Sequence, residues 1–189
     1  TSLSIAQNMD EKLAKEQRIT SSYSLYLTMR DGVRIAADIH MPKSYKKGDK
    51  LPVLLYQTIY QRSSRVPVVK NPDVSKASDW QAMPKLDHKE SSPIEFLALN
   101  KGYVVIKTDV RGTGASFGHR NSPLPPDEIQ DTYDILDWII AQPWSNGNVG
   151  AYGISYTGMT AGMAATVGHP ALKAVVLGWS AIYDEYKSA

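Results

Sequence analysis

The chain has 189 residues, enough for one domain with a buried core, since single domains commonly contain about 100–200 residues. Hydrophobic residues make up 42% and charged residues 21%, which excludes a disordered or low-complexity chain. The formal net charge of +2 excludes a strongly basic surface, so we expect no nucleic-acid partner. The absence of cysteine excludes disulfides, thiolate nucleophiles and cysteine-ligated metal sites.

No apolar run reaches the roughly 18 residues of a membrane span, and residues 1–20 are too polar for a signal peptide. We therefore expect a soluble protein with no membrane partner. The sequence begins with Thr1 rather than Met, so we expect that an upstream segment was removed. A cytoplasmic and an exported location both stay open.

The chain opens with a polar segment followed by a strand pair. Residues 1–20 alternate in charge and predict a solvated helical lead-in to a domain covering residues 21–189. Residues 23–27 and 33–39 show the alternation of strands, and the Asp-Gly pair at 31–32 between them predicts a β-hairpin.

The middle of the chain alternates buried strands with longer connections. Residues 51–56 form a continuous apolar run typical of a strand buried on both faces, and 103–106 form another. Between them, residues 61–90 lack periodicity and contain three prolines, which predicts an irregular insertion. A helix is predicted to start at Pro93 and to end before Gly102.

Two further helices and two strands follow. Residues 127–142 predict a helix whose buried face comprises Ile129, Tyr133, Leu136 and Ile140. The aspartates of this helix are expected on a solvated face rather than around a metal; they are Asp131, Asp134 and Asp137. A turn is predicted at 144–147, a strand at 149–152, a helix at 156–167 and a last strand at 172–177.

This order of elements predicts an α/β fold whose mostly parallel sheet opens with an antiparallel hairpin and has helices on both faces. In such sheets the functional site lies at the carboxyl ends of the strands. The loops of interest therefore follow Tyr56, Ile106, Tyr152 and Leu177.

One of these loops, residues 153–158 (GISYTG), places Ser155 on a sharp turn between a predicted strand and a predicted helix. A serine there is exposed at a helix N-terminus, where unpaired N–H groups favour developing negative charge. The generic nucleophile elbow has glycine two positions after the serine, whereas this chain has Thr157 there and Gly158 next. A purely structural Ser-Gly turn is the alternative from the motif alone.

Four segments in order resemble the cocaine esterase and X-Pro dipeptidyl-peptidase (CocE/NonD) family of α/β-hydrolases; they are residues 30–38 (RDGVRIAAD), 109–116 (DVRGTGAS), 141–147 (AQPWSNG) and 152–158 (YGISYTG). The resemblance covers about residues 23–189, apart from most of 61–90. It implies the N-terminal part of an α/β-hydrolase domain that acts on a small ester or amide, or on a peptide.

The resemblance implies a role for three residues. Ser155 would be the nucleophile that forms an acyl-enzyme. The backbone N–H of Tyr156 would donate one hydrogen bond to the oxyanion. The hydroxyl of Tyr60 matches the tyrosine that donates the second. No cofactor and no metal are implied.

Other polar residues near these positions receive structural interpretations. Relatives that cleave α-amino acid esters carry an acidic residue soon after the tyrosine, whereas Gln61 and Arg62 follow here, which leaves an uncharged or anionic acyl group open. Asp109 and Arg111 are expected to fix the strand-end loop by an ion pair and hydrogen bonds. Residues 112–114 (GTG) lack the further glycine and lysine of a phosphate loop.

A catalytic base for Ser155 is not evident, since the family order is serine, aspartate, histidine. His169 is expected at the far end of the following helix, because the predicted helix over residues 156–167 spans about 18 Å at roughly 1.5 Å per residue. His40 is predicted to be remote, and neither His88 nor His119 matches the family's base. We therefore expect the triad aspartate and histidine, and the last strands of the sheet, to come from a C-terminal remainder or a second chain.

Three hypotheses follow. The first is a serine esterase or acyl hydrolase acting through Ser155, with this fragment inactive on its own. The second is a non-catalytic interaction module on an incomplete hydrolase scaffold, whose open sheet edge pairs with another chain. The third is an aminopeptidase of the X-Pro dipeptidyl type.

Overall fold

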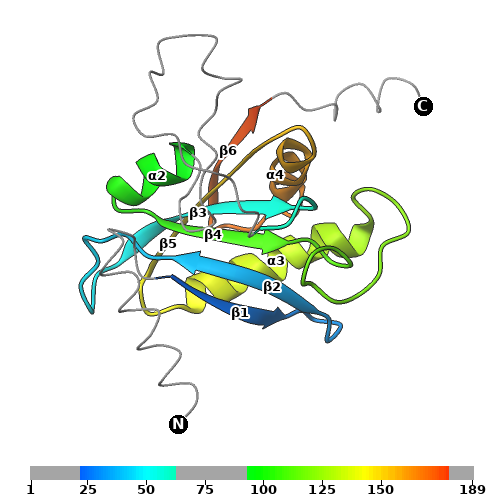
Figure 1. The fold of residues 1–189 in the computed structure, drawn as a ribbon, viewed down its shortest axis with the longest axis horizontal. Helices are drawn as coiled ribbons and strands as arrows, with labels where there is room; N and C mark the ends of the chain where they lie inside the picture. The colour runs from blue at the N-terminus through cyan, green and yellow to red at the C-terminus, as the bar shows by residue number, and fades with distance from the viewer. Residues whose placement is uncertain (1–21, 63–92, 179–189) are drawn as a thin grey trace.

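The computed structural model describes residues 22–62 and 93–178 of the chain (Figure 1). The predicted lead-in at 1–20 and most of the predicted insertion at 61–90 lie outside these ranges. The described elements are β1 (Ser22–Thr28), β2 (Arg34–His40), β3 (Leu51–Thr58), α2 (Pro93–Asn100), β4 (Val104–Asp109), α3 (Pro126–Ala141), β5 (Ser145–Ile154), α4 (Tyr156–Thr166) and β6 (Leu172–Gly178).

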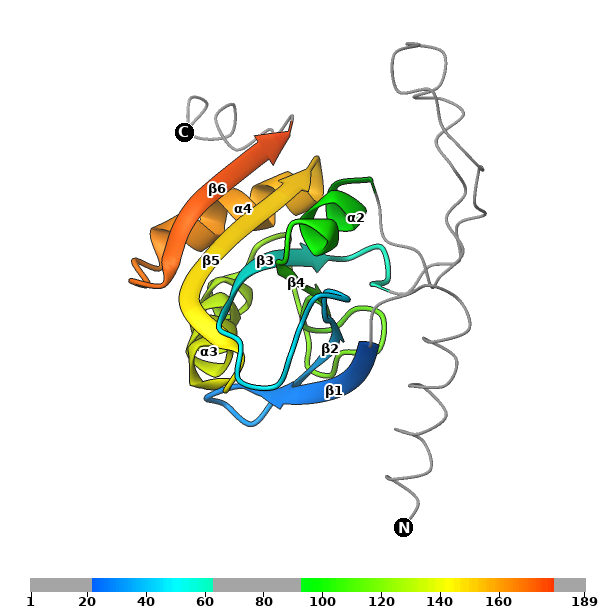
Figure 2. The same cartoon turned by 90° about the vertical axis from the view of Figure 1, so that its left-hand side faces the viewer.

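One six-stranded sheet forms the centre of the molecule, with the strand order β1-β2-β4-β3-β5-β6. The β1 and β2 strands form the predicted antiparallel hairpin, and β2 is also antiparallel to β4. The β3, β4, β5 and β6 strands are parallel to their neighbours. Figure 2 shows the twist of this sheet and the helices packed against it. The predicted α/β class with a mostly parallel sheet is confirmed.

The two faces of the sheet are covered differently. Because neighbouring side chains of a strand point to opposite faces, Ile106 and Lys107 of β4 mark the two sides. Ile106 belongs to a core that also contains Ile135 and Ile139 of α3. Lys107 lies 3.3 Å from the carboxylate of Glu95 in α2. Helix α3 therefore covers one face and α2 the other.

The predicted buried face of α3 is wrong by part of a turn. Ile140 is 41% exposed, and the buried residues are Glu128, Asp131, Thr132, Ile135, Leu136 and Ile139. Asp131 was expected on a solvated face, but it is 3% exposed and accepts a hydrogen bond from Nε of Arg111 at 2.7 Å. Arg111 thus compensates the cost of burying this carboxylate, which apolar periodicity alone cannot reveal.

The predicted turn at 144–147 also differs from the structure, because β5 starts at Ser145 and contains most of it. Turn chemistry is nevertheless present. Gly147 has a φ of 80°, and the side chains of Ser145 and Asn146 accept hydrogen bonds from the backbone N–H groups of Gly147 and Asn148. The register between β3 and β5 shifts here, so the turn residues form an irregularity within the strand.

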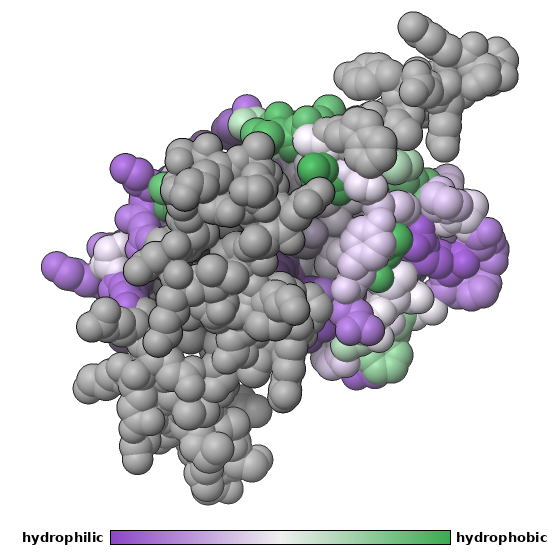
Figure 3. Space-filling model, turned by 45° about the horizontal axis from the view of Figure 1, so that its top comes forward, coloured by the Kyte–Doolittle hydropathy of each residue, from purple (hydrophilic) through white to green (hydrophobic). Residues whose placement is uncertain are grey.

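Strand β6 lies at one end of the sheet, and no described strand pairs with its outer edge. Val176 is 63% exposed and Leu177 is 39% exposed on this strand, and Ile154 at the end of β5 is 62% exposed. Figure 3 shows hydrophobic side chains at the surface on the upper side of the molecule, where β6 lies. Across the described residues, no helix is long and apolar enough to cross a membrane.

Candidate active site

The loops after β3 and β5 lie next to each other at one edge of the sheet. The two strands are parallel neighbours, with Leu55 opposite Ala151. Both strands continue for three more residues, to Thr58 and Ile154, and so end at the same level. Tyr60 and Ser155 follow these strand ends by two residues and one residue. The fold therefore brings the two predicted catalytic side chains to adjacent loops at the carboxyl edge.

Ser155 occupies a strained turn between β5 and α4. Its φ of 58° and ψ of −128° fall in a region that side-chain-bearing residues rarely adopt. The residue is exposed, and its backbone N–H donates to the carbonyl of Gly178 at 3.1 Å. This conformation lifts the serine out of the sheet at the N-terminus of an 11-residue helix, as a nucleophile elbow requires.

Two neighbours of Ser155 close the turn. A Cβ atom on Gly153 would lie 2.1 Å from the carbonyl oxygen of Thr157, so only glycine fits at this position. The hydroxyl of Thr157 contacts the backbone N–H and the carbonyl oxygen of Ile154, both at 2.8 Å. Threonine thus stabilises the turn at the position where the generic elbow has glycine.

The side chain of Tyr156 links the turn at Ser155 to the loop between β4 and α3 and to the start of α3. Its hydroxyl donates to Oε1 of Glu128 at 2.9 Å and accepts hydrogen bonds from Arg120 and from the backbone N–H of Leu124. Burial raises the pKa of Glu128 and, together with the charge of Glu128, raises the pKa of Tyr156 to about 12. Tyr156 is also the first residue of α4, so its backbone N–H has no acceptor within the helix.

The substitution Tyr156→Phe is expected to lower the free energy of unfolding by about 1–3 kcal/mol, because it leaves the buried Glu128 carboxylate and the Leu124 N–H without their hydroxyl partner. Denaturant unfolding measures this difference. Tyr26→Phe is the matched control, because Tyr26 is 47% exposed, and we expect a change within about 0.5 kcal/mol. Equal effects of the two substitutions would contradict the anchoring role of Tyr156.

Tyr60 lies on a turn that starts at the end of β3. Its backbone N–H donates to the hydroxyl of Thr58 at 2.9 Å, and the next residue, Gln61, has a left-handed φ of 70°. The Tyr60 side chain is 57% exposed. The turn thus carries a phenol at the edge of the sheet that also carries Ser155.

The expected ion pair between Asp109 and Arg111 is not formed. Asp109 binds Arg62, whose Nη1 lies 2.6 Å from Oδ2, whereas Arg111 binds Asp131 and Asp31. The two residues still fix the strand-end loop, but through partners from other parts of the chain. Neither Arg62 nor Asp131 was identified as such a partner, since both lie far away in sequence and no local spacing marks the contact.

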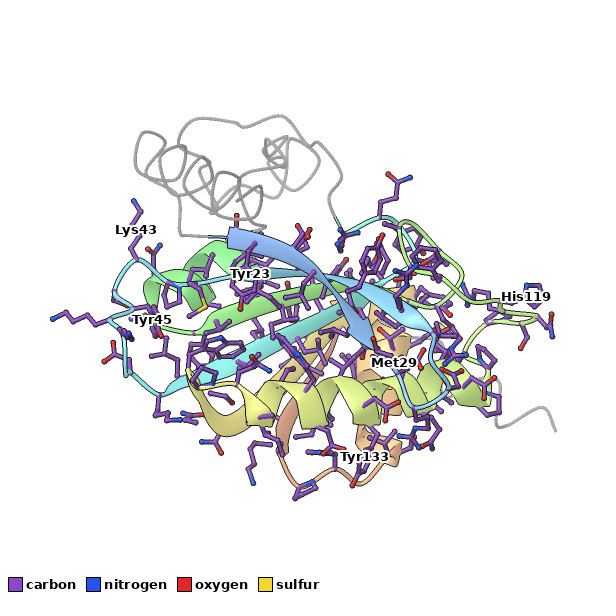
Figure 4. The ribbon with its side chains drawn as sticks, turned by 90° about the horizontal axis from the view of Figure 1, so that it is seen from below. Tyr23, Met29, Lys43, Tyr45, His119 and Tyr133 are labelled. Atoms are coloured by element: carbon purple, nitrogen blue, oxygen red, sulfur yellow. The ribbon has the colours of Figure 1, made fainter. Side chains whose placement is uncertain are left out.

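None of the histidines in the described ranges forms a hydrogen bond with Ser155. His40 is paired with Val105 near the start of β4, at the opposite edge of the sheet, and burial followed by the charge of Lys107 lowers its pKa. His119 is exposed at the outer end of the loop between β4 and α3 (Figure 4). His88 lies outside the described residues.

His169 follows α4 at the end remote from Ser155, as predicted. Its Nε2 lies 3.1 Å from the Asp137 carboxylate, and its Nδ1 accepts a hydrogen bond from the backbone N–H of Ala171 at 3.0 Å. The imidazole therefore joins the loop after α4 to α3. Among residues 22–62 and 93–178, no group of three or more His, Asp or Glu side chains could hold a metal ion.

The strand order and the helix-backed turn after β5 define an α/β-hydrolase. Comparison with known proteins gives the family. The chain belongs to the X-Pro dipeptidyl-peptidase (S15) family, whose sequence model matches residues 31–189. The family resemblance inferred from the four sequence segments is confirmed.

Individual relatives agree with this assignment. A candidate serine esterase of Mycobacterium bovis is 38% identical over 172 residues, which cover 86% of this chain and 25% of that protein. Cocaine esterase of Rhodococcus sp. is 34% identical over 156 residues, which cover 80% of this chain and 22% of that enzyme. A CocE/NonD family hydrolase of Staphylococcus aureus matches in structure with a TM-score of 0.65 and 30% identity, over 81% of this chain and 26% of that one. The chain thus spans about a quarter of the length of these relatives.

Proposed function

We propose that the protein is a serine esterase in which Ser155 is the nucleophile. The observation that carries the proposal is the backbone conformation of Ser155, which has a φ of 58° in the turn between β5 and α4. This turn can close only because residue 153 is glycine. Strain of this kind costs about 1–3 kcal/mol and persists where the surroundings enforce it, as at catalytic serines. Membership in a family of esterases and peptidases supports the same chemistry.

In the proposed reaction, Ser155 Oγ attacks the carbonyl carbon of an ester and transfers its proton to a base. The negative charge that develops on the carbonyl oxygen is stabilised by the backbone N–H of Tyr156 and by the hydroxyl of Tyr60. The alkoxide leaves with the proton from the base, and a water molecule then hydrolyses the acyl-enzyme by the reverse sequence of proton transfers.

We propose that the base and its orienting carboxylate come from sequence beyond Ala189 or from a second chain. Two observations support this. No described histidine forms a hydrogen bond with Ser155, and the chain covers only about a quarter of the length of its relatives. We propose that residues after β6 also pair with its outer edge, with which no described strand pairs.

We propose an ester with an uncharged acyl group as the substrate, in preference to an X-Pro peptide or an anionic ester. A carboxylate favours binding of a peptide N-terminus, and the two carboxylates that the structure describes in contact with the Tyr60 turn, those of Asp38 and Asp109, are both engaged by Arg62. The same contacts engage the Arg62 guanidinium, which therefore does not offer its charge to an anionic acyl group. This choice narrows the alternatives left open by the sequence.

A fluorophosphonate probe tests the proposal. The probe should form a covalent adduct on Ser155 of the polypeptide extended beyond Ala189, and mass spectrometry of the peptides locates it. The same polypeptide should hydrolyse p-nitrophenyl butyrate. If the extended polypeptide carries no label on Ser155, the chain is the non-catalytic interaction module and the proposal is wrong.

Tyr60→Phe is expected to lower kcat for p-nitrophenyl butyrate by about 10²–10³-fold, the usual effect of losing one oxyanion donor. KM should change little, because the hydroxyl acts on charge that develops in the transition state. Tyr26→Phe is the control, since this exposed tyrosine lies on β1, at the far end of the sheet from β6. A kcat within threefold of the unsubstituted protein would exclude Tyr60 from the oxyanion hole.

A further inference from the structure

Arg62 closes the turn that carries Tyr60. Its backbone N–H donates to Oδ1 of Asp109 at 2.6 Å, and its Nη1 donates to Oδ2 of the same carboxylate, also at 2.6 Å. On the other side, its Nε lies 3.1 Å from Oδ1 of Asp38. One side chain thus joins the turn after β3 to the end of β4 and to the middle of β2.

These three charged groups are almost completely removed from solvent. The side chains are 14% exposed in Arg62, 8% in Asp38 and 1% in Asp109. The two hydrogen bonds from Arg62 to Asp109 are short and charge-assisted, so they hold these partners in one arrangement, whereas Arg62 Nε and Asp38 form an ion pair without hydrogen-bond geometry.

The loop after β4 fixes the Asp109 carboxylate in turn. The backbone N–H of Ala115 donates to Oδ2 of Asp109 at 3.0 Å. A Cβ atom on Gly114 would lie 2.3 Å from the same oxygen, so this loop can close over the carboxylate only with glycine there. Asp109 is therefore a rigid point of attachment for Arg62.

Tyr60 depends on its backbone for its position, because its side chain is 57% exposed. The turn is attached at its start by the Tyr60 N–H on Thr58 and at its end by the Arg62 N–H on Asp109. Between them, Gln61 has a φ of 70°, a conformation that costs energy for glutamine and that the two attachments must maintain.

We infer that Arg62 is a positioning residue for the Tyr60 hydroxyl: its contacts with Asp109 and Asp38 hold the turn that aims this hydroxyl at the oxyanion. The inference rests on the proposed function, and it assigns Arg62 to transition-state stabilisation rather than to binding of an acyl group. A donor displaced by about 1 Å loses much of its effect, so the contribution of Arg62 is expected to pass through Tyr60.

A double-mutant cycle in the extended polypeptide tests the inference. The variants are Arg62→Lys, Tyr60→Phe and the combination of the two, each assayed for kcat and KM with p-nitrophenyl butyrate. Lysine keeps a cation between the buried carboxylates, but its single nitrogen cannot reproduce the separate contacts of Nη1 with Asp109 and of Nε with Asp38. Arg30→Lys is the matched control, because Arg30 is 49% exposed and its ion pair joins Asp134 on α3.

We expect Arg62→Lys to lower kcat about 10-fold and to leave KM within twofold. In the Tyr60→Phe background, the same substitution should change kcat less than twofold, because the hydroxyl that it positions is absent. Arg30→Lys should leave kcat within twofold. The inference is overturned if Arg62→Lys lowers kcat by the same factor in both backgrounds, or if it changes KM instead of kcat.

Gln61→Gly tests the turn that Arg62 closes without disturbing the buried charges, and it keeps the inference falsifiable if Arg62→Lys fails to fold, because an unchanged kcat would overturn it. Glycine adopts a φ of 70° without strain but loosens the turn, so we expect a fall in kcat that again disappears in the Tyr60→Phe background. Labelling distinguishes failure of the proposed function from failure of the inferred role of Arg62. Without a label on Ser155 the proposed function fails, whereas a labelled protein with multiplicative effects refutes only the role of Arg62.

Discussion

Replacing Ser155 by alanine in the extended polypeptide is expected to lower kcat for p-nitrophenyl butyrate by about 10⁶-fold and to abolish fluorophosphonate labelling. The nucleophile and its base act as a unit, so loss of the hydroxyl leaves only the modest acceleration given by binding and by the oxyanion donors. Ser122→Ala is the control, because Ser122 is an exposed serine of the loop between β4 and α3. A loss smaller than about 100-fold would contradict a nucleophilic role for Ser155.

A second substitution at Ser155 distinguishes a functional serine from a structural one through its effect on the free energy of unfolding. Ser155→Gly should also remove the activity, yet it should raise the free energy of unfolding by about 1 kcal/mol, because glycine adopts the φ of 58° without strain. Thermal and denaturant unfolding measure the change. A serine that stabilised the turn through its hydroxyl would instead give a less stable glycine variant.

Gly153→Ala is expected to destabilise the protein by about 3 kcal/mol or more and to remove labelling at Ser155. The added Cβ would lie 2.1 Å from the carbonyl oxygen of Thr157 and 2.7 Å from the backbone nitrogen of Gly158. Both atoms belong to the first turn of α4, so relief requires the helix to move away from β5 rather than a side chain to rotate. Such a movement also displaces the Tyr156 N–H from its proposed position at the oxyanion.

Gly150→Ala is a matched control in the same strand. A Cβ on Gly150 would lie 3.6 Å from a methyl group of Leu54 and 3.8 Å from the carbonyl oxygen of Ala174, which are ordinary packing distances. We expect a change in unfolding free energy within about 0.5 kcal/mol and normal labelling. If Gly150→Ala were as damaging as Gly153→Ala, the elbow geometry would not explain either result.

The fold could be predicted well where a segment has a simple hydrophobic pattern. The hairpin, the buried strands β3 and β4, and helix α4 match their predicted ranges to within three residues, since alternation, apolar runs and Gly or Pro boundaries fix them locally. The face of α3 could not be predicted in this way. Its buried stripe includes Glu128 and Asp131, whose partners, Arg120 and Arg111, lie on the loop before the helix.

The candidate site was predictable for residues that belong to a motif and unpredictable for residues that act through long-range contacts. Ser155 is marked by its place on a turn after a strand, and Tyr60 by the family resemblance. Arg62 is not, because its role depends on Asp109, which is 47 positions away and becomes a neighbour only when β3 pairs with β4. For a charged residue in a turn after one strand, carboxylates at the end of the neighbouring strand are therefore the first partners to consider.

The outer edge of β6, with which no described strand pairs, has a consequence for biosynthesis. Residues 22–154 build the first five strands and most of the described core before β6 leaves the ribosome. If a further strand follows, as proposed, then until it emerges the exposed Val176 and the outer backbone edge of β6, with which no described strand pairs, offer a surface on which two nascent chains can pair. We therefore expect pauses in translation just after this region to increase aggregation on polysomes, and chaperones that bind extended apolar segments to suppress it.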